Sequence, residues 1–239
     1  MLFRSMMKYL ITILGFVTVL SFIPMIMFAQ PWHYAVALLM YFVLQTFGAN
    51  LGYHRIATHK LVEVPRWFEV FTVLVGTLTL KAPAMWWAAQ HNSHHTTSDT
   101  YDDTHSIAKH GFFKAVFLIP FCEYELKPRY IIRLLKDPFY QFQQKYYWHI
   151  NILFGVVLFL IDPFSLIYAW LAPAGLVHIV STMTAIYSHR NGKANDDPIF
   201  SLLIFGEGYH KYHHDHPRAY KYNWTDISGH ILELVKKKG

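Results

Sequence analysis

Long apolar stretches separated by short polar breaks dominate the first part of the chain. Residues 9–28 carry no charged side chain, and residues 32–53 are again uncharged after a break at Gln30-Pro31. As a helix, either stretch would be about 30 Å long, enough to cross the hydrocarbon core of a bilayer. A cleaved signal peptide would have a shorter apolar region and a small-residue cleavage site, and neither is present. We predict two antiparallel transmembrane helices joined by a tight turn.

A second apolar block, residues 146–187, is too long for one crossing and is broken at Asp162-Pro163. Proline and an unpaired charge are both unfavourable inside a membrane helix, so the block predicts spans at 147–161 and 164–187. Residues 67–80 are apolar but too short to cross, which favours a re-entrant or surface-lying helix. The fold class expected is all-α integral membrane, with four transmembrane helices in two hairpins.

Composition and charge agree with a membrane protein rather than a nucleic-acid-binding one. Hydrophobic residues make up 54% of the chain and the net charge is +6, but no basic helix or nucleic-acid-binding motif accompanies that charge. Neither of the two far-side turns contains any of the 21 Lys and Arg. By the positive-inside rule, the termini and a helical cap of residues 54–146 and 188–239 face the cytosol. We expect one domain over residues 1–239, with its single cysteine, Cys122, excluding an internal disulfide.

Three histidine clusters indicate metal chemistry. The two later clusters share the spacing i, i+3, i+4, which places imidazoles on one helix face. The first pair is spaced i, i+5, about 140° apart on an ideal helix, so it should straddle a helix end. One histidine alone is usually a core residue, but eight in three groups exceed the ligands of one zinc, which implies two metals. The clustered residues are His54, His59, His91, His94, His95, His210, His213 and His214.

Carboxylates lie close to two of these clusters. Asp99 and Asp102 follow the second one, and Glu207 stands between two glycines just before the third. A metal-bound imidazole commonly donates its other N–H to a carboxylate, which is the role we assign to all three. For Asp99 and Asp102 a solvated acidic loop with capping roles is an equal alternative. Residues 225–239 predict a short, solvated or headgroup-facing helix that ends in lysines.

The same motifs resemble the three histidine boxes of the membrane fatty acid desaturases, in the branch that includes stearoyl-CoA desaturase and bacterial acyl-lipid Δ9 desaturases. The matching segments are His54-Arg55-x-x-x-His59, His91-x-x-His94-His95-x-x-Ser98-Asp99-Thr100 and Gly206-Glu207-Gly208-Tyr209-His210-x-x-His213-His214. The resemblance implies a di-iron centre held by the eight clustered histidines, a cytosolic cap on four transmembrane helices, and O2-dependent insertion of a cis double bond into an acyl chain.

Two positions depart from the family pattern. Asn92 stands where the family usually has Arg. Relatives also carry Asn-Ser-x-x-His in the fourth span, whereas the corresponding stretch here, residues 181–185, ends in Ala185. His189, one turn later, and His178, two turns earlier, lie on the same helical face as Ala185. We favour His189 as the ninth ligand because it lies nearer the cytosolic end.

The substrate and the electron source are further expectations. An apolar groove near the boxes would be walled by Trp86, Trp87, Tyr209 and Tyr53, for which ordinary aromatic packing is the alternative. The acyl substrate would be an acyl-CoA or a membrane lipid. No fused redox domain is recognisable, so the resemblance implies an external donor such as cytochrome b5 or ferredoxin, docking on the basic cytosolic face.

Two other functions fit the same residues. A fatty acyl or lipid hydroxylase or ketolase could use the same di-iron scaffold, because a small shift of the substrate carbon converts dehydrogenation to oxygen insertion. A non-catalytic membrane metal carrier or sensor is the second alternative. A carrier should place its ligands within the spans along a path, whereas these histidines lie at the cytosolic ends of the predicted spans.

Overall fold

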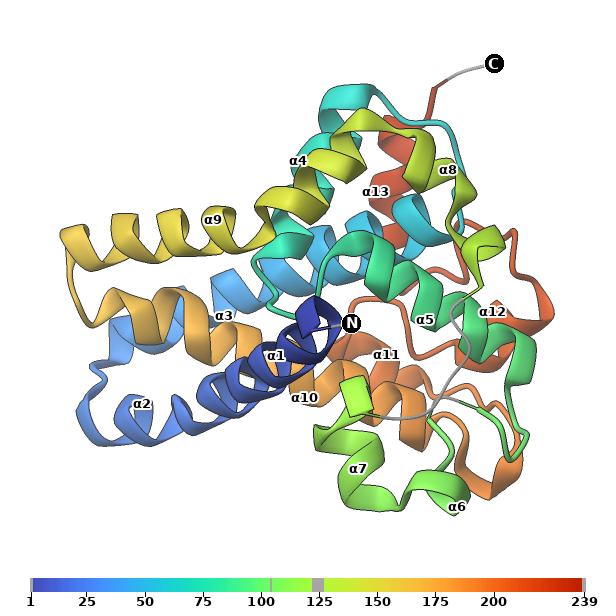
Figure 1. The fold of residues 1–239 in the computed structure, drawn as a ribbon, viewed down its shortest axis with the longest axis horizontal. Helices are drawn as coiled ribbons and strands as arrows, with labels where there is room; N and C mark the ends of the chain where they lie inside the picture. The colour runs from blue at the N-terminus through green and yellow to red at the C-terminus, as the bar shows by residue number, and fades with distance from the viewer. Residues whose placement is uncertain (1, 104, 122–126, 238–239) are drawn as a thin grey trace.

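The computed structural model describes residues 2–103, 105–121 and 127–237, and within them the chain is helical, apart from one isolated bridge between Asp196 and Tyr209 (Figure 1). Cys122 and Lys238 lie outside the described residues. The elements in chain order are α1 (Leu2–Leu20), α2 (Phe22–Phe28), α3 (Pro31–Val43), η1 (Leu44–Thr58), α4 (Arg66–Thr77), α5 (Ala84–Thr97), α6 (Ile107–His110), α7 (Phe112–Phe117), η2 (Ile119–Phe121), η3 (Pro128–Tyr130), α8 (Ile132–Lys136), α9 (Pro138–Ile161), η4 (Ile167–Leu171), α10 (Ala172–Tyr187), η5 (Arg190–Gly192), α11 (Pro198–Leu203), α12 (His210–Asp215) and α13 (Ile227–Val235).

The first hairpin forms where the sequence predicts it. Helices α1 and α2 give an apolar segment, Met7–Phe28, within which the hydroxyls of Thr18 and Ser21 donate to carbonyls one turn back. These two hydroxyls are thus satisfied inside the helix, as an apolar environment requires. At the turn, the Gln30 N–H donates to His33 Nδ1 at 2.7 Å, and α3 begins at a proline, where no N–H is needed.

Helix α3 runs without a break into η1, a π-helix that carries His54 and ends just before His59. Helix α4 packs closely across it, and a Cβ built on Gly52 would lie 2.3 Å from the Thr72 carbonyl oxygen. Only glycine allows two backbones to approach so closely. Helix α4 has 12 residues, so the prediction that this segment is too short to span agrees with the structure. Its packing fixes the end of η1 that holds His54.

The second hairpin differs in one respect from the predicted spans. Helix α9 begins at Pro138 rather than at residue 147, and its first half is polar. It turns at Asp162-Pro163, and η4 with α10 runs back. By length and hydropathy, three described segments are able to cross a membrane, and α9 is not among them; they are Met7–Phe28, Pro31–Thr58 and Ile167–Thr184.

The two hairpin turns lie at one end of the molecule, and the histidine-bearing helices α5 and α12 lie at the other (Figure 1). Large apolar side chains beside the turns are exposed, with Ile26 at 75% and Leu160 at 77%. Continuous apolar surface is unusual on a water-soluble monomer and is typical of contact with lipid. The apolar helices therefore indicate membrane association.

The C-terminal helix α13 is not simply a solvated tail, as the sequence suggested. Its Leu232 is fully buried and packs with Leu51 of η1. At its N-terminus the Asp226 carboxylate accepts the Gly229 N–H at 2.8 Å. The helix was predicted correctly, but its packing draws Asp226 into the interior of the cap.

Candidate metal centre

Helices α5 and α12 present their histidines as the spacing predicts. Helix α5 starts after Pro83 and carries the second cluster in its last two turns, while α12 consists almost entirely of the third. Spacings of three and four residues place the rings on one helix face. The rings of His91 and His95 are 4.6 Å apart between centroids, as are those of His210 and His214.

The first histidine pair lies closer than an ideal α-helix allows. The His59 N–H donates to the His54 carbonyl at 3.1 Å, a bond between residues five apart that is characteristic of a π-helix. The two ring centroids are consequently only 4.8 Å apart, whereas on an ideal α-helix the two side chains would point in different directions. The pair does straddle the helix end, because His59 is the residue after η1.

Nine histidines form two adjacent groups, within each of which the candidate ligand atoms all lie within 4.8 Å of one another. We call them the five-histidine group and the four-histidine group. The five-histidine group contains His54, His59, His91, His95 and His213, and the four-histidine group contains His94, His189, His210 and His214. The groups touch where His95 stacks on His214, with 4.4 Å between ring centroids. His189 thus joins the clustered histidines, whereas His178 belongs to neither group.

Partners on Nδ1 leave the Nε2 atoms facing inward. The Nδ1 atoms of His54, His94 and His189 lie 2.8 Å from carboxylate oxygens of Glu207, Asp103 and Asp99 respectively. Such partners place the proton on Nδ1, so the Nε2 lone pair is free to bind a metal.

The inward-facing Nε2 atoms are mutually unsatisfied. Those of His54 and His213 are 3.1 Å apart, and those of His189 and His210 are 2.8 Å apart. The buried Nε2 of His94 has no partner at all among the residues described. Lone pairs about 3 Å apart repel unless a cation lies between them, and ligands about 2.1 Å from a metal are separated by about this distance. The donor set therefore fits metal ions in both groups.

Several of the clustered imidazoles are held in the neutral form that metal binding requires. Burial lowers the pKa of His59, His91 and His213 well below the usual value, and neighbouring imidazoles lower it further. In the four-histidine group, burial lowers the pKa of His214 to about 3. Metal binding at neutral pH would therefore displace few protons from these rings.

A buried ion network supports the five-histidine group. The fully buried Arg55 lies between two acids, with Nε 2.9 Å from Glu207 Oε1 and Nη1 2.9 Å from Asp226 Oδ2. Burial alone would raise the pKa of Glu207, but His54 and Arg55 lower it to about 2. Gly206 has a φ of +122°, and a Cβ there would lie 2.1 Å from Asp226. Only glycine can bring the backbone this close to the network, as expected for a glycine beside the carboxylate.

Comparison with known proteins gives the family. The family model described as "Fatty acid desaturase" matches residues 29–239. The chain belongs to the fatty acid desaturase family. Its members are oxidoreductases that act on fatty acids, so the chain is an enzyme of this class.

Three relatives illustrate the range of the similarity. The chain is 33% identical over 194 residues to an sn-1 stearoyl-lipid 9-desaturase of Anabaena variabilis, covering 75% of this chain and 70% of the relative. It is 31% identical over 229 residues to an sn-1 stearoyl-lipid 9-desaturase of Synechocystis sp., covering 90% and 69%. It is 26% identical over 245 residues to a Delta(9)-fatty-acid desaturase of Caenorhabditis elegans, covering 88% and 72%.

Among the carboxylates assigned to this desaturase, Asp102 is the one the structure corrects. Its side chain is exposed and lies 2.8 Å from Lys109 Nζ, away from the histidines. The next residue, Asp103, contacts His94 instead. Burial alone would raise the pKa of Asp103, but His94 lowers it to about 2. Asp99 and Glu207 lie against imidazoles as expected.

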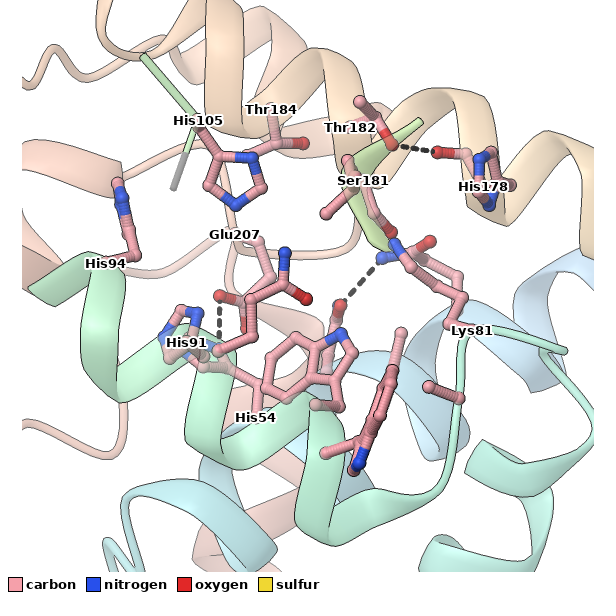
Figure 2. A pocket seen from close by; sticks show the side chains of 18 of the residues that line it. His54, Lys81, His91, His94, His105, His178, Ser181, Thr182, Thr184 and Glu207 are labelled. Carbon is pink, nitrogen blue, oxygen red and sulfur yellow. Dashed lines mark hydrogen bonds and ion pairs between the residues drawn. The ribbon is translucent and has the colours of Figure 1, made fainter. Parts of the chain in front are cut away.

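A cavity lies beside both histidine groups of the desaturase. Its empty space, counted together with the solvent at its open mouth, is about 1120 Å³, and His54, His91, His94 and His210 line it (Figure 2). Trp86 and Trp87, two of the four aromatic residues expected near a substrate groove, are in its wall. Tyr53 and Tyr209 are not: Tyr53 is buried and donates to the Ala82 carbonyl, and Tyr209 pairs with Asp196. The contacts of these two tyrosines are thus with the protein itself, as ordinary packing would give.

Four supporting residues were not assigned a role from the sequence. They are Arg55, Asp103, Tyr222, whose hydroxyl lies 3.0 Å from His213 Nδ1, and Asp226. Arg55 directly follows a cluster histidine, so its position was a usable signal. Tyr222 and Asp226 stand in a segment without a recognisable motif, and only the fold brings them to the site.

Proposed function

We propose that the chain is an O2-dependent fatty acyl desaturase that inserts a cis double bond at the Δ9 position of a saturated acyl chain. The observation that carries this proposal is the pair of touching imidazole groups at the wall of a mostly apolar, partly open cavity, a setting that suits an acyl chain. Relatives named as stearoyl-lipid and acyl-CoA desaturases support it, and they leave open whether the acyl group is carried by a lipid or by CoA.

We assign one iron ion to each histidine group, with His189 as the ninth ligand. Bound iron would supply the oxidising power, from O2, for removing hydrogen from an unactivated methylene. The chain's own residues hold the rings: Glu207 fixes the tautomer of His54, and Asp99 that of His189. Trp86 and Trp87 form an apolar wall beside the rings, which excludes water from the acyl chain.

Four membrane crossings with both termini and the metal centre on the cytosolic side complete the proposal. Three segments have the length and hydropathy of a crossing, and we assign the fourth to the apolar C-terminal half of α9. The absence of Lys and Arg from both hairpin turns supports the orientation. An external donor such as cytochrome b5 or ferredoxin would dock near α12, where Lys211 and Arg218 are exposed.

Expression in a host that lacks its own desaturase, followed by gas chromatography of the fatty acids, tests the proposal. The wild type should produce cis monounsaturated chains, and His94→Ala should not. His149→Ala removes an exposed imidazole from α9 and serves as the matched control, with product expected at the wild-type level. Saturated profiles from a folded, iron-loaded wild type with a competent donor would contradict desaturation, and hydroxylated products would indicate oxygen insertion.

A further inference from the structure

The cavity beside the histidines has a polar end that an alkyl chain does not need. Lys81, in the loop between α4 and α5, lines it together with His178, Ser181 and Thr182 of α10. These three α10 residues are spaced i, i+3, i+4 and share one helix face. Figure 2 shows Lys81 reaching toward Ser181 while the histidines of the metal centre stand at the opposite side. The cavity therefore connects a metal site to a cationic site.

No acidic side chain in the described part of the chain pairs with the Lys81 ammonium. Among the residues that the structure describes, no hydrogen bond or ion pair reaches its Nζ. Among the described residues of the cavity wall, Glu207 is the only carboxylate, and both of its oxygens are already engaged by His54 and Arg55. Burial lowers the pKa of Lys81 to about 7. A buried amine without an acceptor is stabilised when a bound ligand supplies an oxygen that accepts its hydrogen bond.

Neighbouring polar atoms are unsatisfied as well. Ser181 Oγ and Gln45 Oε1 are buried without a hydrogen-bond partner in the described part of the chain. Gln45, which lines the cavity, donates to Asn50 Oδ1 at 2.7 Å, and its own carbonyl oxygen has no donor among the described residues. Polar groups inside a membrane-embedded helix bundle are costly, and where they face a cavity they mark binding sites. The cavity wall also contains apolar side chains, including those of Ile11 and Ala49, which suit methylene groups.

We propose that Lys81 is a specificity residue that binds an oxygen of the acyl group, a carboxylate or an ester carbonyl, and thereby sets which methylene lies against the histidines. The inference rests on the proposed desaturase function and deepens it, because it names the chemical group that the cavity recognises. The acyl chain would run from its oxygen at Lys81 toward the metal centre. A methyl end pointing at Lys81 would leave the ammonium without an acceptor.

Binding of brominated probes tests this independently of turnover. An omega-brominated dodecanoate, its methyl ester and a bromododecane would be titrated into the detergent-solubilised full-length protein, with tryptophan quenching as the readout, because Trp86 and Trp87 line the cavity. Relative to the wild type, Lys81→Met should lower the affinity for the two oxygen-bearing probes by roughly tenfold or more. Its affinity for bromododecane should change by less than about twofold. Lys81→Gln, which keeps a donor, should be intermediate. Lys145→Met, an exposed lysine of α9, should match the wild type.

The outcomes separate the possibilities. If Lys81→Met loses affinity for the carboxylate probe alone, Lys81 recognises a free acid. If it loses affinity for both oxygen-bearing probes, Lys81 recognises a carbonyl oxygen. Unchanged binding of all probes by a folded Lys81→Met variant would overturn the inference and leave the desaturase proposal intact. If the wild type binds none of the probes, the acyl cavity itself is wrong. In the expression host, Lys81→Met should give a mixture of double-bond positions where the wild type gives one, and a single unchanged isomer would count against the inference.

Discussion

The five-histidine group and the four-histidine group are built from the same kind of ligand but held in different ways. The former lies between η1, α5 and α12, and its His54 is tied through Glu207 to the buried Arg55. The latter includes His189, which follows the end of α10 and is held by Asp99, a loop residue whose side chain is 32% exposed. Packed helices thus fix one group, and loop carboxylates fix part of the other.

We therefore expect mutations to affect metal binding and stability differently in the five-histidine group and the four-histidine group. A ligand supported by buried ion pairs cannot move without breaking them, so its loss affects both metal binding and folding. A ligand supported from a loop has more freedom to adjust. The predictions below separate the two groups, beginning with the largest expected effect.

Replacement of His213 by alanine should have the largest effect. Its Nε2 lies 3.1 Å from that of His54 and 2.9 Å from that of His95, so it stands at the middle of the five-histidine group. We expect no detectable unsaturated product and loss of about half of the bound iron, measured by gas chromatography and by metal analysis of the purified protein. His216→Ala, an exposed residue of the same segment, should retain both. Full iron content in His213→Ala would contradict its assignment.

Glu207→Gln should weaken the five-histidine group without removing a ligand. The amide can no longer neutralise Arg55, and it holds the His54 proton less strongly than a carboxylate does. Iron affinity should fall by about 10–100-fold, and unfolding should become easier by about 3 kcal/mol because a buried charge loses one of its two partners. Iron titration and denaturant unfolding measure the two effects. Glu233→Gln, which touches only the exposed pair with Lys221, should change neither.

Acid should destabilise the metal-free protein. Burial lowers the pKa of rings in both groups, including His91, His189, His210 and His213, below their value in the unfolded chain. Below about pH 6.5 the unfolded state therefore binds protons that the folded state does not, so stability falls as pH falls. Each such ring contributes up to about 1.4 kcal/mol per pH unit. Denaturant unfolding of the apoprotein between pH 7.5 and 5.5 measures this, and a flat profile would contradict the neutral, buried state of the rings.

Sequence reasoning reached the helices and the faces of the second and third histidine clusters because periodicity alone determines them. It predicted that His54 and His59 straddle a helix end, as they do, but not the π-helical backbone that brings the two rings together, because an ideal α-helix was assumed. It chose Asp102 over Asp103 because spacing cannot tell which of two adjacent carboxylates in a loop points inward. The position of Asp226 beside Arg55 could not be predicted from the sequence, since it depends on the packing of α13 against η1.

The start of α9 was missed for a related reason. Apolar content marked residues 147–161, but the helix begins nine residues earlier, where Asp137 caps it by accepting the Phe139 N–H at 2.9 Å. The polar first half includes Tyr140, fully buried with its hydroxyl 2.8 Å from Glu69. A polar helix that buries its side chains through hydrogen bonds carries no apolar signal, so only the fold reveals it.

The smallest and most discriminating effect should come from the loop acids. Asp99 has a φ of +61°, a conformation that asparagine also tolerates, so Asp99→Asn changes the charge and leaves the backbone unstrained. With a neutral partner for His189, iron affinity of the four-histidine group should fall by about tenfold while the five-histidine group and the stability remain unchanged. Asp102→Asn is the matched control, because it removes only a surface ion pair worth about 0–1 kcal/mol. Equilibrium dialysis over a range of iron concentrations measures this, because one of the two bound iron equivalents should weaken while the other keeps its affinity. Equal losses in both variants would mean that the loop charge as a whole, rather than the Asp99 contact with His189, supports the metal.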